Sequence, residues 1–84
     1  MNSESFNPAH LMPLSLIPTG HSVVLRRVGA GDGIASRLAA MGVLPGTTIE
    51  VRHNDRHGPI ILGVNGGRVM LGRGMASKMS VQDS

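Results

Sequence analysis

Apolar and polar residues alternate along several stretches of the chain, and this spacing is typical of strands with one buried face. The alternation is most regular in residues 48–53, where Ile49 and Val51 fall on one side and Glu50 on the other. The predicted strands cover residues 22–28, 48–53, 60–64, 68–71 and 78–81. Their expected inward side chains are Val23, Leu25, Val28, Ile49, Val51, Ile60, Leu62, Val64, Val69, Leu71, Met79 and Val81. We expect the first and last of these strands to pair.

The alternation breaks in residues 22–28, where Arg26 and Arg27 separate Leu25 from Val28. A β-bulge at the arginine pair would turn Val28 to the same side as Leu25 and would bend the strand sharply. The pair is therefore predicted to lie in a solvated bulge, with an anion site as the alternative interpretation.

A different spacing predicts a short helix after the first strand. Ile34, Leu38 and Met41 recur at i, i+4 and i+7, so they share one helical face. Asp32 precedes this stripe, and its carboxylate can accept hydrogen bonds from the N–H groups of the first turn. Because so short a helix is unstable alone in water, we expect the stripe to pack against the strands.

The residues after this helix predict how it ends. Gly42 stands where a left-handed residue can end a helix, so that Val43 or Leu44 folds back onto the last turn. Pro45-Gly46 fits the centre of a type II turn. The chain is therefore predicted to reverse here and to enter the next strand.

The two ends of the chain differ from the middle. Residues 1–10 are polar, without period, and predict a disordered tail. Residues 11–82 are expected to form one domain. Pro13 and Pro18 argue against a helix at its start, so the segment between them is predicted to lie extended against the sheet. Residues 82–84 are expected to fray.

Composition narrows the fold class. The 84 residues include 12 Gly and 5 Pro, which favours many tight turns, and Phe6 is the only aromatic residue, so the core is expected to be aliphatic. Residues 65–67 predict a hairpin, and residues 72–77 predict one helical turn. The predicted fold is mainly β: a small SH3-like barrel of about five strands, with one inserted short α-helix and a helical turn before the last strand.

The same composition excludes several functions. The absence of cysteine excludes disulfides, iron–sulfur clusters and thiolate zinc sites. No window approaches the roughly 20 apolar residues of a membrane helix, so no direct membrane insertion is expected. The net charge of +3 is scattered and stacking aromatics are missing, so no nucleic-acid partner is expected. The five acids are dispersed, so we do not expect an enzyme.

One cluster has the chemistry of a metal site. His53, Asp55 and His57 fall at the tip of the polar loop between two predicted strands. Imidazole and carboxylate are ligands for divalent ions, but their separation depends on the turn. Weak divalent metal binding and a set of solvated loop residues are the two interpretations.

Residues 37–47 read Arg-Leu-Ala-Ala-Met-Gly-Val-Leu-Pro-Gly-Thr, and Ile49-Glu50-Val51 follows. This segment resembles the core motif of FeoA domains, and residues 14–20, 58–60, 68–76 and 79–81 are similar to the rest of that family. The resemblance implies a small SH3-like cytoplasmic protein, peripheral to the inner membrane through its partner FeoB, the ferrous-iron transporter with a GTPase domain. It would bind the G domain or the membrane part of FeoB and regulate or support iron uptake.

The resemblance implies no catalytic residues, no cofactor and no shared metal ligands. The same domain forms the C-terminal part of iron- and manganese-dependent repressors, which gives the alternative of a metal-responsive binding or scaffold domain. No helix-turn-helix precedes it here, so a DNA-binding repressor is disfavoured. Exposed strand edges leave a homo-oligomer open.

The predicted partner-binding surface combines exposed apolar side chains with a rim of arginines, as interfaces commonly do. Strand alternation points Met70 outward between Arg68 and Gly72. The candidate residues are Arg37, Leu44, Arg68, Met70, Arg73 and Met75. The alternative is that these apolar side chains complete the core and the arginines are solvated.

Overall fold

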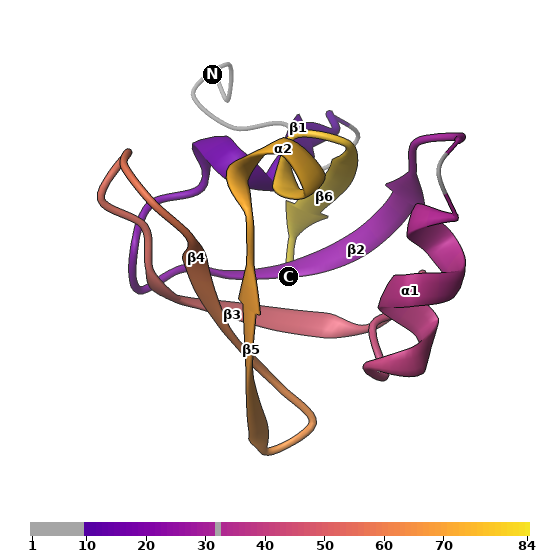
Figure 1. Cartoon of the computed structure of the whole chain (residues 1–84). Helices are drawn as coiled ribbons and strands as arrows, with labels where there is room; N and C mark the ends of the chain where they lie inside the picture. The colour runs from indigo at the N-terminus through magenta and orange to yellow at the C-terminus, as the bar shows by residue number, and fades with distance from the viewer. Residues whose placement is uncertain (1–9, 32) are drawn as a thin grey trace.

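Figure 1 shows the computed structural model, which describes residues 10–31 and 33–84. The elements in chain order are β1 (Met12–Pro13), the 3₁₀ helix η2 (Leu14–Leu16), β2 (Ser22–Val28), α1 (Ile34–Ala40), β3 (Thr48–His53), β4 (Ile60–Val64), β5 (Gly67–Leu71), α2 (Arg73–Ala76) and β6 (Met79–Asp83). The strands form one antiparallel sheet in the order β1-β6-β2-β3-β4-β5.

The predicted fold class is confirmed. The sheet curls around a single core, α1 lies at one side of it and α2 precedes the last strand (Figure 1). The first and last predicted strands pair, because β6 lies between β1 and β2. The described residues form six strands rather than about five, because Met12 and Pro13 pair with Val81 and Ser80.

The core is aliphatic, as the composition predicts. No polar side chain is buried in the described part of the chain. Of the side chains expected inward, Val28 and Val69 are only partly buried and pack against the core, and the others are buried. The buried residues are Leu14, Ile17, Val23, Leu25, Ile34, Leu38, Val43, Ile49, Val51, Ile60, Leu62, Val64, Leu71, Ala76, Met79 and Val81.

The predicted bulge is present in β2. The register against β6 shifts between Leu25 and Arg27, so Arg26 is the extra residue. Its Nε donates a hydrogen bond of 2.6 Å to Gln82 Oε1 on β6. Arg26 thus links the bulge of β2 to β6, which favours the interpretation of the arginine pair as part of a bulge over that of an anion site.

Helix α1 packs only part of its predicted stripe. Ile34 and Leu38 are buried, but Met41 is 40% exposed. The helix ends at Ala40, and Met41 leaves the helical conformation with φ −98° and ψ 8°, so its position in the 3.6-residue repeat no longer places it on the core. Gly33 precedes the helix with φ 64°. Asp32 lies outside the described residues.

The end of α1 confirms the predicted turn chemistry. Gly42 has φ 80°, and Val43 N donates to Leu38 O at 2.9 Å, which is the closing hydrogen bond of a Schellman motif. Val43 is buried and Leu44 is exposed. The bond of 2.9 Å from Thr47 N to Leu44 O, with φ 97° at Gly46, closes the expected turn.

Two predictions for the chain ends are wrong. The segment after Pro13 is not extended, because Pro13 stands before the first residue of η2 and its fixed φ of −63° is compatible with starting a helix. The last strand does not end at residue 81 as expected, because Gln82 and Asp83 continue its pairing with β2. Ser84 N also donates to Ser22 O at 3.3 Å.

Candidate partner-binding surface

Met70 lies on the outer face of the sheet, as its strand alternation predicts. It is 61% exposed on β5, which pairs only with β4 in the described structure. Its cross-strand neighbour is Ile61, which is paired in turn with His53 of β3. Methionine and isoleucine therefore form a short apolar row on this face, and the exposed Arg68 lies on the same strand.

A second exposed apolar pair lies at the end of α1. Met41 and Leu44 are 40% and 50% exposed. Between them, Gly42 O accepts a hydrogen bond of 3.1 Å from Asn65 Nδ2, which ties the helix end to the β4–β5 hairpin. Arg37 is exposed on the same helix. This hydrogen bond therefore joins the helix end and the hairpin at one corner of the molecule.

The other two predicted residues, Arg73 and Met75, are involved in packing. Arg73 is partly buried, and its Nη1 and Nη2 donate to Gly58 O at 3.4 Å and Ser15 O at 3.2 Å. Met75 is partly buried and packs against the core. The structure thus distributes the six predicted residues over α1, β5 and α2, and Met70 and Leu44 are the exposed apolar ones among them. Their role in binding stays a prediction.

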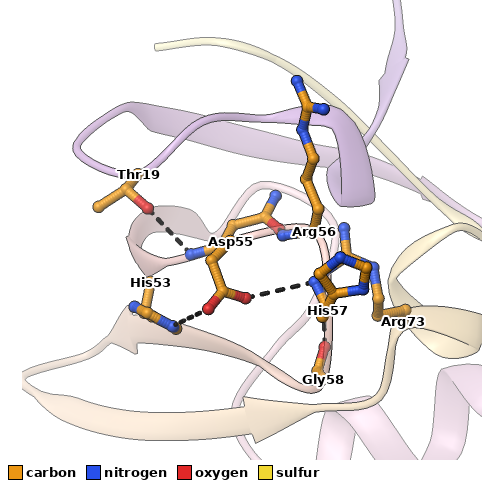
Figure 2. A network of polar contacts seen from close by, with 8 residues as sticks. Thr19, His53, Asp55, Arg56, His57, Gly58 and Arg73 are labelled. Carbon is orange, nitrogen blue, oxygen red and sulfur yellow. Dashed lines mark hydrogen bonds and ion pairs between the residues drawn. The ribbon is translucent and has the colours of Figure 1, made fainter.

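The loop between β3 and β4 holds the candidate metal ligands. His53 Nε2 lies 3.3 Å from Asp55 Oδ2, and the backbone N–H of His57 donates to Asp55 Oδ1 at 3.3 Å (Figure 2). This backbone hydrogen bond and, secondarily, the charge of His53 lower the pKa of the Asp55 carboxyl from its ordinary value of 3.8. His57 thus meets Asp55 through its main chain.

No group of three or more metal-ligating side chains occurs within residues 10–31 and 33–84. His53 and Asp55 supply only two side-chain ligands in this arrangement. The weak divalent metal binding considered for this loop stays a prediction.

Sequence reasoning missed the junction between this loop and η2. Asn54 Nδ2 donates to Ser15 O at 3.0 Å and to Ile17 O at 2.8 Å. Its backbone N–H donates to Thr19 Oγ1 at 2.9 Å. Leu16, in the same 3₁₀ turn, is 64% exposed. The three-residue spacing of the buried Leu14 and Ile17 was the available signal that Leu16 points outward.

Within the described residues, the helices are too short and too polar for any of them to span a bilayer. The family model described as FeoA domain matches residues 12–83. The chain belongs to the FeoA domain family. A protein of Methanocaldococcus jannaschii that is named as an Fe(2+) transport protein A is 34% identical over 74 residues, which cover 88% of this chain and 89% of that protein.

Solved structures of FeoA proteins share the fold. A crystal structure of an iron uptake regulatory protein (FeoA) superimposes with a TM-score of 0.83 at 32% identity, covering 89% of this chain and all of that one (100%). The solution structure of FeoA from Chlorobium tepidum gives a TM-score of 0.78 at 25% identity and covers 86% and 70% of the two chains.

The fold also occurs inside a larger regulator. IdeR of T. acidophilum matches with a TM-score of 0.81 at 18% identity, and the aligned part covers 93% of this chain but 36% of IdeR. At this identity the likeness concerns the fold alone.

Proposed function

We propose that this FeoA-domain protein binds the cytoplasmic part of a FeoB-type membrane GTPase transporter and thereby regulates or supports ferrous iron uptake. The family match over residues 12–83 carries the proposal. The relative in Methanocaldococcus jannaschii, named for Fe(2+) transport, supports it. The proposed action is through contact with another protein.

The outer face of β4 and β5 is the proposed contact. Met70 places most of its side chain in solvent beside Ile61, and the charged Arg68 stands two residues earlier on the same strand. Burial of a methionine side chain is worth about 1.5–3 kcal/mol. A binding surface with this apolar centre would gain affinity mainly from Met70, and the arginine would contribute at the rim.

Calorimetry with the transporter's purified cytoplasmic G domain tests the proposal. The titration is run with GDP and with a non-hydrolysable GTP analogue, in metal-free buffer and again with ferrous iron. Affinity that differs between the nucleotides would support regulation of the GTPase cycle. Absence of binding in every state would refute the G domain as the partner, and the membrane part of the transporter would then be tested in detergent.

Met70→Asp should weaken this binding by tenfold or more, because it places a charge where the interface is apolar. Since Met70 is 61% exposed, the stability of the domain should change by less than about 1 kcal/mol. Met12→Asp is the control, because it makes the same change at a 37% exposed side chain on β1, at the other end of the strand order. Equal affinity of both variants would show that the β4–β5 face is not the contact.

A further inference from the structure

A polar cleft lies where three segments distant in the sequence meet: η2, the β3–β4 loop and α2. Its volume is about 410 Å³, and it is separate from the β4–β5 face. The lining residues are Ser15, Leu16, Pro18, Asn54, Arg56 and Arg73. We call it the η2–α2 cleft. It contains two cations and no acid.

Arg73 bridges two sides of this cleft. Its guanidinium donates to Ser15 O at 3.2 Å and to Gly58 O at 3.4 Å, so it contacts η2 and the β3–β4 loop at once. These carbonyl oxygens carry partial charge only, and no carboxylate of the described residues lies within ion-pair distance of Arg73. An arginine has further N–H donors beyond those used here, so this guanidinium can still bind an anion.

Arg56 supplies the second cation. Its backbone adopts φ 79°, a conformation that a residue with a side chain rarely takes, and its N–H donates to Asn54 Oδ1 at 3.4 Å. In Figure 2 its side chain extends away from the carboxylate of the neighbouring Asp55. No ion pair joins it to a described acid.

The acid closest in sequence is engaged elsewhere. Asp55 Oδ2 pairs with His53 and Oδ1 accepts from the His57 N–H, so neither oxygen neutralises an arginine of the cleft. Glu50 is paired with Arg52 at 3.4 Å. The cleft is therefore electropositive without an internal counter-charge.

An apolar edge accompanies this charge. Leu16 is 64% exposed at the cleft, and Pro18 lies beside it. An inorganic anion would leave this edge in water, whereas a peptide that carries a carboxylate and an aliphatic side chain would cover both parts.

We propose that the η2–α2 cleft binds an acidic segment of a protein partner, with an Asp or Glu side chain between Arg56 and Arg73 and an aliphatic side chain against Leu16. The assignment deepens the proposed function and rests on it, since the cytoplasmic part of the transporter is the expected source of the segment. The segment would reach a different face from Met70, so the two contacts would act together.

The test uses the full chain labelled with ¹⁵N and two synthetic probes, an acetylated Leu-Glu-Leu-Glu peptide amide and its Leu-Gln-Leu-Gln counterpart. The acidic probe should shift the amide signals of residues 15–16, 54–56 and 73 in a saturable manner, and the neutral probe should not. Shifts from both probes alike, from neither, or equally from inorganic phosphate would overturn the proposal. The calorimetry with the G domain decides the proposed function separately.

Arg56→Gln removes one cation without removing any side-chain hydrogen bond present in the structure, so the fold should be retained. It should weaken binding of the acidic probe about tenfold, as expected for the loss of one charge-assisted contact. Arg27→Gln is the control for net charge, because it removes the same single charge from an exposed position on β2 outside the cleft. Weakening by Arg27→Gln that matches or exceeds the effect of Arg56→Gln would mean that long-range charge, and not the cleft, attracts the probe.

Discussion

Replacing Asn54 should destabilise the domain far more than its position in a loop suggests. Its amide Nδ2 donates to Ser15 O and Ile17 O, which holds η2 against the end of β3. Each such bond contributes about 1 kcal/mol net, so Asn54→Ala should cost about 2 kcal/mol. At about 4–8 °C per kcal/mol for a domain of this size, the melting temperature should fall by about 8–16 °C.

Asn54→Asp sharpens the test because it keeps the shape and removes the donor. At neutral pH a carboxylate oxygen would face two carbonyl oxygens, so this variant should be less stable than Asn54→Ala. In the folded protein the pKa of the introduced acid would be raised, because only its protonated form can donate to these carbonyls. Its destabilisation should therefore shrink as the pH falls from 7 towards about 4.

Thermal unfolding followed by far-ultraviolet circular dichroism measures these effects, since Phe6 is the only aromatic residue and offers little fluorescence. His57→Ala is the control in the same loop, because the His57 side chain is exposed and makes no hydrogen bond among the described residues. Its effect should stay within about 0.5 kcal/mol. A melting temperature for Asn54→Ala equal to that of His57→Ala would refute the role of Asn54 in holding η2 against the end of β3.

Two further predictions concern backbone conformation and pH. Gly42→Ala should lower the free energy of unfolding in urea by about 1–3 kcal/mol, because φ is 80° and a Cβ would lie 2.9 Å from Asn65 Nδ2. Adding Asn65→Gly should recover only part of the lost stability. A Gly42→Ala variant as stable as the original protein would contradict the left-handed helix end. Asp55 has a lower pKa folded than unfolded, so its contribution to stability is present above pH 3.8 and is lost as the pH falls through the folded pKa. Asp55→Asn should therefore make the free energy of unfolding depend less on pH under acidic conditions. An unchanged dependence would contradict the assigned hydrogen bonds.

Local turn chemistry explains why much of the fold could be predicted from the sequence. The Asn65-Gly66 hairpin has φ 52° and 78° at its central residues, as a type I′ turn requires, and Val64 pairs with Gly67 across it. The bulge at Arg26 and the left-handed Gly42 follow equally from neighbouring residues. In each case the residues that decide the conformation stand within a few positions of one another.

The features that were missed depend on contacts between distant residues. The amide of Asn54 lies 37 and 39 positions from its acceptors, and no pattern in the sequence pairs them. The exposure of Met41 depends on the helix ending one residue earlier than its hydrophobic stripe. The cleft combines η2, a loop and α2, so its charge became visible only once the fold placed Arg56 and Arg73 together.

The place of β6 in the strand order has a consequence for synthesis of the protein in the cell. A ribosome that has released the chain up to Lys78 has delivered β1 and β2, but the strand that joins them is still in the exit tunnel. Until it emerges, Val23 and Leu25 lack the neighbouring Val81 and leave apolar surface in water. Folding of this domain must therefore wait until β6 has left the tunnel, and a chain stalled before residue 79 should be a substrate for chaperones or proteases.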